Sequence, residues 1–355
     1  MTDTKIKQLQ KFLGKDEAAL ITTEENRFYF TGFPSSAGTL FVTADKAFFL
    51  IDFRYVEKAR AVIPFCEVIL AERGGVTVSD LAKKEGVTSI LFETAGTSVS
   101  TYKSMKEKYG DMLSDSDRLD GFIRDCRMFK EQYELDLIKE AQRLTDDTFS
   151  YILGKIEPGK TEREIMLDME FYSRNAGSEG ASFEFIVVSG KNSSLPHGVP
   201  TDKKIEKGDF VTMDFGCIVG GYHSDMTRTV AVGCATDEMK KVYDTVKAAQ
   251  DAAFAAIRPG VVCKDVDKAS RDLIYAAGYE GCFGHGLGHS VGVEIHEYPN
   301  FNPVCEEILR PGHIMTVEPG IYLENKFGVR IEDMICCTEN GFINITASPK
   351  DLIIL

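Results

Sequence analysis

The sequence predicts an α/β protein of two domains, the second of which is internally duplicated. Its 355 residues exceed the usual size of one small domain and fall short of three. Over roughly the first 120 residues, short apolar runs alternate with helical stretches, which is typical of a mixed or parallel sheet. The rest of the chain repeats one order of helices, turns and strands. We therefore place the two domains at residues 1–122 and 123–355.

Four short apolar runs are the predicted strands of the first domain. They are Ala18–Ile21, Gly38–Val42, Ala47–Ile51 and Ser89–Phe92. Helical patterns between and after these runs cover Arg54–Val62, Val78–Glu85 and Val99–Tyr109. The acidic stretch Asp111–Asp120 has little periodicity, so the boundary is expected beside it.

Helices give the first sign of duplication in the second domain. A helical pattern covers Leu135–Ile152, and the capping box Thr161–Glu164 starts another helix after Pro158-Gly159. About a hundred residues later the same order recurs, with helices predicted over Glu238–Ile257 and Lys264–Ala277. The domain is thus expected to contain two copies of one unit.

Strand segments repeat in the same way. Glu206–Asp214 matches Arg310–Glu318 at a constant offset in a glycine, a threonine and the final acid. The phrase His197-Gly-Val-Pro200 precedes the first segment, and His296-Glu-Tyr-Pro299 precedes the second. Two copies of a helix–helix–strand unit would pack about a pseudo-twofold axis.

Each repeat carries two acids where its strands meet. Asp214 and Glu318 end apolar runs, and Asp225 and Glu332 lie on the strands that return after glycine-rich turns. A hairpin sets the second acid of each pair beside the first, and the pseudo-twofold brings the pairs together. Buried carboxylates need a cation, a proton or a full set of donors.

Two divalent cations are the expected compensation for four such acids. His289, in the glycine-rich stretch Phe283–Ser290, offers one further ligand. Four carboxylates and one imidazole form a hard, oxygen-rich set that favours Mn²⁺, with Co²⁺, Fe²⁺ or Zn²⁺ able to substitute. A metal pair can activate water and stabilise an oxyanion, so the sequence predicts a hydrolase.

Several phrases together resemble one known family. Asp214, Asp225, His289, Glu318 and Glu332 are similar in order and surroundings to the metal ligands of the pita-bread metallopeptidases. Four phrases resemble the Xaa-Pro aminopeptidase and Xaa-Pro dipeptidase (prolidase) branch in particular: His285-Gly-Leu-Gly-His289, His296-Glu-Tyr-Pro299, Thr316-Val-Glu-Pro-Gly320 and Val329-Arg-Ile-Glu-Asp333.

The resemblance extends to the first domain and implies the fold of both. The stretch Asp52-Phe-Arg54-Tyr55-Val-Glu57 resembles the creatinase-like N-terminal domain of that branch. The implied architecture is a creatinase-like α/β domain with a mixed sheet, followed by a pseudo-twofold pita-bread α+β domain.

The resemblance also implies a role for each metal ligand. Asp214 and Asp225 would bind one ion, with Asp214 and Glu332 bridging or shared, and His289 and Glu318 would complete the other. Glu318 would in addition carry the proton from the bridging water to the leaving nitrogen.

Four further residues receive substrate roles by the same resemblance. His197 and His296 would hydrogen-bond the substrate carbonyl and the tetrahedral intermediate. His285 would line the pocket, and Arg330 would orient Glu332 or a substrate carboxylate by a bidentate contact.

The expected activity is hydrolysis of the Xaa–Pro bond at peptide N-termini by an Xaa-Pro aminopeptidase. The alternative is an Xaa-Pro dipeptidase restricted to dipeptides. Prolidase-like members often carry an arginine directly after the His-Glu-x-Pro phrase, and Asn300 stands there, which favours the aminopeptidase. The first domain is expected to shape the substrate entrance of a homodimer, where Arg54 would reach the partner's site.

Other functions are weighed against this one. Gly288-His-Ser290-Val-Gly292 fits the nucleophile elbow of serine hydrolases, but the elbow needs a strand before it and a helix after it. A glycine-rich stretch precedes Ser290 and an extended one is predicted after it. A metal-free creatinase-like hydrolase and a peptide-binding module without catalysis both conflict with the complete ligand set.

Composition and charge exclude further classes of partner. A formal net charge of −14 disfavours nucleic acids and anionic membranes. Nine cysteines without C-x-x-C pairs, and no apolar secretory run at the N-terminus, indicate a reducing cytoplasm. His313 is expected at the surface and His223 at the periphery of the site, while Cys217 and Cys282 are expected to serve packing.

Overall fold

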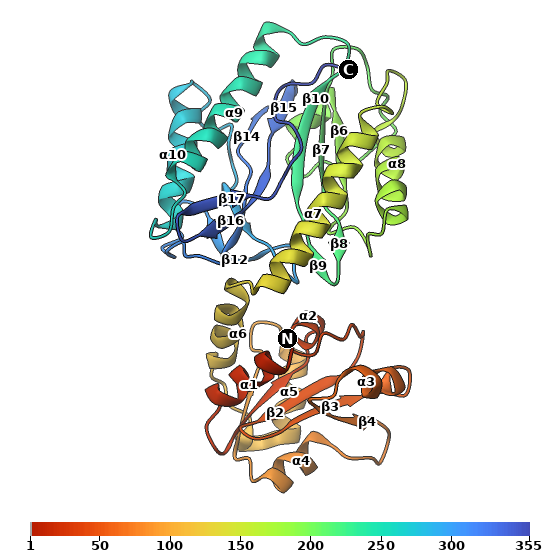
Figure 1. The fold of residues 1–355 in the computed structure, drawn as a ribbon, viewed down its shortest axis with the longest axis vertical. Helices are drawn as coiled ribbons and strands as arrows, with labels where there is room; N and C mark the ends of the chain where they lie inside the picture. The colour runs from red at the N-terminus through yellow and green to blue at the C-terminus, as the bar shows by residue number, and fades with distance from the viewer. Residues whose placement is uncertain (1) are drawn as a thin grey trace. The chain divides into compact units, whose positions relative to one another are not determined.

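The computed structural model describes residues 2–355, which divide into two compact units, 2–126 and 127–355 (Figure 1). The first unit contains a five-stranded sheet in the order β4-β3-β2-β1-β5. Its elements are α1 (Thr2–Phe12), β1 (Glu17–Ile21), α2 (Glu24–Thr31), β2 (Thr39–Thr43), β3 (Ala47–Ile51), α3 (Val56–Val62), β4 (Glu67–Leu70), α4 (Val78–Glu85), β5 (Ser89–Phe92) and α5 (Val99–Tyr109), with α6 (Arg118–Met128) running across the boundary.

The sheet of the first unit is mixed, as the sequence predicts. β1 is antiparallel to β2 and parallel to β5, and β3 is antiparallel to β2 and parallel to β4. All five residues of β3 are buried, which explains its continuous apolar run. The four predicted strands are present to within one residue at each end, whereas α1, α2, β4 and α6 were not predicted.

The second unit contains two larger sheets, ordered β10-β7-β6 and β12-β11-β13-β16-β17, and two two-stranded sheets, β8-β9 and β14-β15. Its helices are α7 (Gln132–Ile152), α8 (Glu162–Asn175), α9 (Asp237–Ala256) and α10 (Cys263–Ala276). Its strands are β6 (Ile186–Ser189), β7 (Phe210–Phe215), β8 (Ile218–Val219), β9 (Tyr222–His223), β10 (Met226–Ala231), β11 (Gly288–Ser290), β12 (Glu297–Phe301), β13 (Ile314–Val317), β14 (Gly320–Leu323), β15 (Phe327–Arg330), β16 (Asp333–Thr338) and β17 (Gly341–Asn344).

The order of these elements follows the predicted duplication. In the first half, α7 and α8 precede β6, β7 and β10, and the hairpin β8–β9 separates β7 from β10. In the second half, α9 and α10 precede β11, β13 and β16, and the hairpin β14–β15 separates β13 from β16. The central strands pair antiparallel in both halves, β7 with β10 and β13 with β16.

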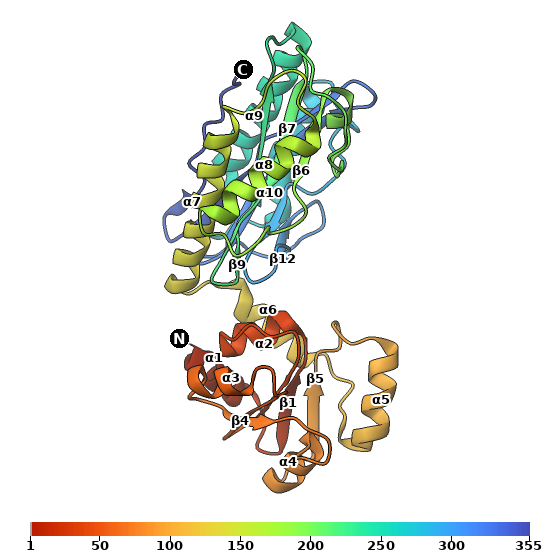
Figure 2. The same cartoon turned by 90° about the vertical axis from the view of Figure 1, so that its right-hand side faces the viewer.

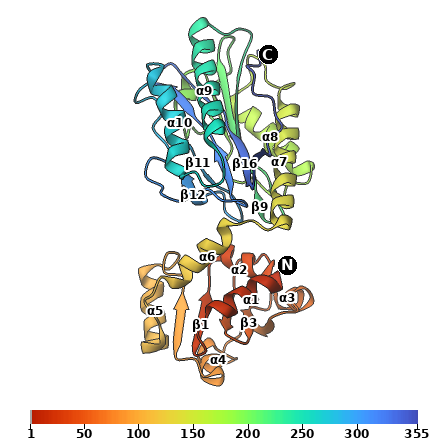
Figure 3. The same ribbon diagram turned by 60° about the vertical axis from the view of Figure 1, so that its left-hand side comes forward.

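Each half has its own helical layer and apolar core. Figure 2 shows α8 in front of β6 and β7, and residues of α7, α8 and these strands form one core cluster. Figure 3 shows α9 beside α10, and their apolar faces form a second cluster with β13 and β16.

The threonine caps of α8 and α9, Thr161 and Thr236, accept from backbone N–H groups in the first turn, as in ordinary N-caps.

The two halves meet along β10 and the chain between β15 and β16. The Glu332 N–H donates to the Thr227 carbonyl at 3.1 Å. The Arg330 N–H donates to Thr229 Oγ1 at 3.3 Å. The ends of the central strands of both halves are thereby brought to one place.

His313 is buried, contrary to the prediction that it lies at the surface. Its ring packs against Phe129 at a centroid distance of 4.7 Å. Nδ1 lies 3.4 Å from the Arg310 N–H, and burial lowers the pKa of the imidazole to about 4. The buried neutral ring thus has an aromatic partner in place of solvent.

Candidate metal centre

Four acids and one histidine gather where the central strands of the two halves end. Asp214 lies in β7, Asp225 directly before β10, Glu318 directly after β13, Glu332 directly before β16, and His289 in β11. All five line one cavity of about 630 Å³, a size typical of small-ligand sites. The structure therefore brings together the complete predicted ligand set.

His289 is oriented for coordination through Nε2. Its Nδ1 lies 3.0 Å from the Ser290 carbonyl, which can only accept, so the proton is assigned to Nδ1. The lone pair of Nε2 then faces Asp225 Oδ2 and Glu318 Oε1, each 3.5 Å away. A backbone carbonyl that fixes the tautomer in this way is common beside metal-binding histidines.

Three of the acids each have one buried oxygen without a hydrogen-bond partner in residues 2–355. These atoms are Asp214 Oδ1, Asp225 Oδ1 and Glu332 Oε1. Ligand atoms of Asp225, His289 and Glu332 lie within 4.8 Å of one another. A buried acceptor without a partner is costly, and the oxygen-rich set suits hard divalent ions. The residues present thus fit the metal pair that the sequence predicts.

The protonation behaviour of the acids agrees with this fit. Burial raises the pKa of Asp225 well above its usual range, and the charges of Asp214 and Glu318 add to the effect. Burial and the charge of Asp225 do the same to Glu332, and burial also raises the pKa of Glu318. A cation at this place would remove the repulsion that holds protons on these groups.

Two threonines and one arginine hold three of the other carboxylate oxygens. Thr227 Oγ1 donates to Glu332 Oε2 at 2.7 Å, and Thr316 Oγ1 donates to Glu318 Oε1 at 3.2 Å. Sequence analysis did not identify either threonine as a site residue. The available signal was spacing, because each lies two residues from a ligand, where side chains of a strand share a face.

Arg330 contacts Asp214 and not Glu332, one of the two partners that the resemblance implied, the other being a substrate carboxylate. Its Nη2 donates to Asp214 Oδ2 at 2.5 Å, and its Nη1 donates to the Tyr322 hydroxyl at 2.8 Å. It reaches Glu332 only through Thr227, to whose Oγ1 its Nε donates at 3.0 Å. The guanidinium therefore orients one acid directly and a second through a hydroxyl.

Three further histidines line the same cavity: His197, His285 and His296. Burial lowers the pKa of His285 to about 4, and its Nε2 lies 2.9 Å from the Tyr322 hydroxyl. The His296 ring lies 4.5 Å from that of His289, centroid to centroid. Burial and the neighbouring His289 lower the pKa of His296. His285 is accordingly neutral at pH 7 and can act as a hydrogen-bond partner.

Glu297 anchors the segment that carries His296. Its side chain is 4% exposed and accepts from Lys130 Nζ at 3.0 Å and from Arg127 Nη2 at 2.6 Å. Although burial opposes its charge, Lys130 and Arg127 lower the pKa of this carboxyl to about 2. The ion cluster fixes the start of β12, directly after His296.

The serine-hydrolase alternative lacks its geometry. Ser290 is buried, does not line the cavity, and lies 2.9 Å from Lys130 Nζ through its Oγ. A nucleophile elbow requires a following helix, and Val291–Ile295 is irregular, neither that helix nor the extended segment expected from sequence.

The other residues singled out from sequence are not among those that line the cavity. Arg54 belongs to the first unit, where it is exposed and makes an ion pair with Asp52. His223, Cys217 and Cys282 belong to the second unit and do not line the cavity. Burial raises the pKa of the Cys217 thiol, as expected of a packing residue.

The cavity wall combines apolar and neutral polar side chains. Phe183, Phe185 and Ile295 contribute apolar surface, and Asn300 and Asn302 contribute amides. Among residues 2–355, Arg330 is the only lysine or arginine in the cavity lining. Its Nη2 already donates a hydrogen bond to Asp214.

Comparison with known proteins agrees with the geometry. Residues 136–339 match metallopeptidase family M24, and residues 5–129 match the creatinase/prolidase N-terminal domain. A solved Xaa-Pro dipeptidase from Bacillus anthracis is 38% identical, with a TM-score of 0.95 and 100% of both chains covered. The Xaa-Pro dipeptidase of Pyrococcus horikoshii is 34% identical over 98% of each chain. A solved X-Pro aminopeptidase from Thermotoga maritima is 33% identical, with a TM-score of 0.89 over 98% of this chain and 99% of that one.

Proposed function

Because the chain belongs to metallopeptidase family M24, we propose that it is a metal-dependent Xaa-Pro dipeptidase, a prolidase. The observation that carries this proposal is the set of buried carboxylate oxygens without partners beside the unprotonated Nε2 of His289. The names of the relatives support the dipeptidase over the aminopeptidase that the sequence favoured.

The five clustered residues would hold two divalent ions, for which Mn²⁺ suits the donor set best. When bound, such ions supply a nucleophile at neutral pH and electrostatic stabilisation of the oxyanion. Glu318, whose Oε1 lies 3.5 Å from His289 Nε2, would accept the proton of the attacking water and release it to the leaving nitrogen. His197 and His296, on the cavity wall, would donate to the carbonyl oxygen of the scissile bond.

Proline in the substrate explains the apolar part of the wall. Its nitrogen carries no hydrogen after acylation, and its ring fixes φ, so recognition has to rely on the shape of the ring. Phe183, Phe185 and Ile295 offer an apolar surface for it, while Arg330 keeps Asp214 in place.

Cellular location and assembly form a further part of the proposal. All nine cysteines are free thiols, which supports a cytoplasmic location. Within residues 2–355, no helix has both the length and the apolar character to cross a membrane. We propose a homodimer, in which the first unit would shape the substrate entrance and Arg54 would reach the site of the other subunit.

A second candidate, the Xaa-Pro aminopeptidase, is favoured by one feature of the wall. A dipeptide presents a free carboxylate close to the scissile bond, and a cation is the usual partner for it. The neutral Asn300 and Asn302 line the cavity instead. A longer peptide has an amide where the dipeptide has its free carboxylate, and neutral hydrogen bonds from Asn300 and Asn302 would be enough for that amide.

Metal removal and a substrate pair test the proposal. The protein stripped with EDTA is expected to be inactive and to recover with Mn²⁺, and a serine-directed fluorophosphonate is expected to have no effect. Ala-Pro is expected to be hydrolysed faster than Ala-Pro-Ala-Ala. The reverse order would select the aminopeptidase, and activity that persists without metal would refute both candidates.

A further inference from the structure

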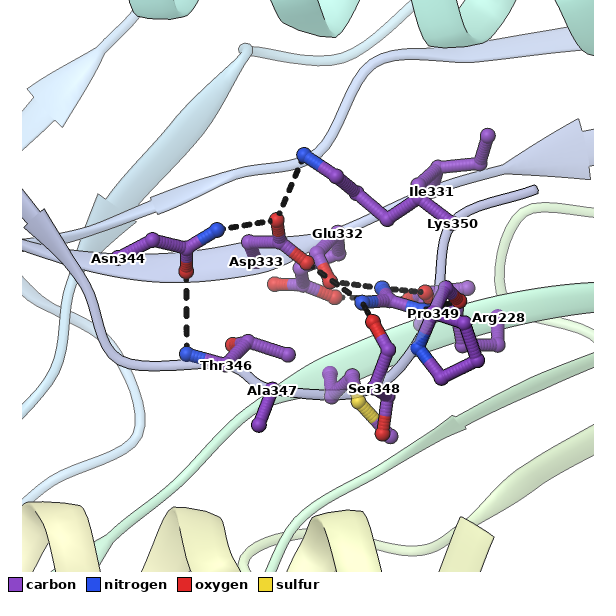
Figure 4. A network of polar contacts seen from close by, with 12 residues as sticks. Arg228, Ile331, Glu332, Asp333, Asn344, Thr346, Ala347, Ser348, Pro349 and Lys350 are labelled. Atoms are coloured by element: carbon purple, nitrogen blue, oxygen red, sulfur yellow. Dashed lines mark hydrogen bonds and ion pairs between the residues drawn. The ribbon is translucent and has the colours of Figure 1, made fainter. Parts of the chain in front are cut away.

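A buried ionic network joins the C-terminal segment to the metal-ligand candidate Glu332 (Figure 4). Arg228, in β10, is 1% exposed. Its Nη1 donates to the Glu332 carbonyl at 2.6 Å, and its Nη2 donates to Asp333 Oδ1 at 2.7 Å. Toward the C-terminus, Nη2 donates to the Ser348 carbonyl at 2.8 Å and Nε donates to the Pro349 carbonyl at 3.0 Å.

Asp333 compensates the charge of this buried guanidinium. It is fully buried, and its Oδ2 accepts from Lys350 Nζ at 3.0 Å and from Asn344 Nδ2 at 2.7 Å. An unpaired charge at this depth would be strongly destabilising. Arg228 and Lys350 therefore depend on Asp333, and Lys350 brings the C-terminal segment into the same cluster.

Independent contacts fix the segment from residue 346 to residue 355 on the second unit. Asp146 of α7 accepts from the Ser348 N–H at 2.9 Å. The Tyr243 hydroxyl of α9 donates to the Lys350 carbonyl at 3.1 Å. The Ala231 N–H of β10 donates to the Ile353 carbonyl at 2.9 Å. The carbonyls of residues 348 and 349 are thus presented to Arg228 from a fixed position.

Glu332 is held at its carbonyl, its N–H and one carboxylate oxygen. Arg228 holds the carbonyl. The Thr227 carbonyl accepts from the N–H at 3.1 Å, and Thr227 Oγ1 donates to Oε2 at 2.7 Å. Among the residues that the structure describes, Oε1 has no partner. These contacts set where that oxygen lies relative to Asp225 and His289.

We propose that Arg228 is a positioning residue for Glu332, and that the C-terminal segment completes the metal centre by holding Arg228. This inference rests on the proposed role of Glu332 as a metal ligand. Second-sphere partners of metal ligands commonly change metal affinity by about 10- to 100-fold. Loss of the Arg228 contacts is expected to act within that range.

Calorimetric titration of the metal-stripped protein with Mn²⁺ tests the proposal. Arg228→Lys keeps the charge but places all its donors on one nitrogen, which cannot reach Glu332 and the C-terminal carbonyls together as the three guanidinium nitrogens do. Its Mn²⁺ affinity is expected to fall about 10- to 100-fold. Asp351→Asn is the matched control, because the Asp351 side chain lies on the same segment, is 88% exposed and pairs with Lys247. The control is expected to bind Mn²⁺ like the wild type.

Three outcomes separate the inference from the function on which it rests. A wild-type protein that binds no Mn²⁺, or a Glu332→Gln variant that binds it normally, would refute the metal role itself. If a folded Arg228→Lys variant binds Mn²⁺ with normal affinity, the positioning role is overturned. If that variant also unfolds at a lower temperature, Arg228 contributes only to the stability of the fold. If the Arg228→Lys variant does not fold, the Lys350→Gln variant takes its place, because the Lys350 side chain is 22% exposed and its loss is easier to tolerate. Reduced Mn²⁺ affinity of Lys350→Gln supports the proposal, and unchanged Mn²⁺ affinity overturns it.

Discussion

Replacing Glu297 by glutamine is expected to destabilise the second unit, because the ion cluster around this carboxylate is buried. Lys130 and Arg127 lower the pKa of Glu297 from 4.5 to about 2. One pH unit of difference corresponds to about 1.4 kcal/mol, so the ionised form contributes about 3 kcal/mol at neutral pH. This agrees with the roughly 3–5 kcal/mol lost when one partner of a buried ion pair is removed.

The sign of the effect with pH follows from the direction of the pKa change. A lowered pKa in the folded state gives stability that is present above the unfolded pKa of 4.5 and is lost as pH falls toward about 2. The difference between wild type and Glu297→Gln is therefore expected to narrow from about 3 kcal/mol at pH 7 to about 2 kcal/mol at pH 3.5.

Scanning calorimetry of the metal-stripped proteins is the suitable assay. The chain has no tryptophan, and calorimetry can resolve separate transitions of the two units. For a domain of this size, about 3 kcal/mol corresponds to a decrease in Tm of about 6–12 °C at pH 7. Glu306→Gln is the control, because that side chain is 72% exposed and pairs with Lys264. A Tm change no larger than the control's, or a difference that does not narrow in acid, would refute the reasoning.

Three further predictions concern the site. Mn²⁺ affinity is expected to rise with pH, because the pKa values of Asp225, Glu318 and Glu332 are raised and Mn²⁺ binding therefore releases protons. The buffer takes up these protons, so a calorimetric binding enthalpy that does not depend on the buffer would contradict this prediction. His296→Ala is expected to lower kcat by about 10²–10³-fold while Mn²⁺ affinity stays normal. If kcat and Mn²⁺ affinity fall by the same factor, His296 is a metal ligand instead. Asn300→Arg is expected to lower the KM for Ala-Pro by about tenfold through a charge-assisted contact, and unchanged kinetics would show that the dipeptide carboxylate lies elsewhere.

Local sequence patterns account for most of the secondary structure that positions the site. The capping box at Thr161 starts α8, and the helical periodicity before it corresponds to α7. These patterns work because caps and amphipathic faces involve residues three or four positions apart. β4 escaped prediction because none of its residues is buried, unlike those of β5, which has the same length and three buried residues.

The sequence alone also indicated the members of the proposed metal centre. Two acids at matching places in two repeats, beside a glycine-rich histidine segment, are visible as a pattern along the chain. Their convergence follows from hairpin geometry and a pseudo-twofold, which local patterns and the repeat together imply.

Which partner each acid takes was decided only by the tertiary structure. Glu332 and Asp333 are adjacent, yet Glu332 lines the cavity while Asp333 faces Arg228 on the opposite side, because successive side chains near a strand alternate in direction. Arg330 bonds to Asp214, 116 positions away. Such pairings depend on how strands that are far apart in the sequence pack together, and local sequence patterns do not predict this packing.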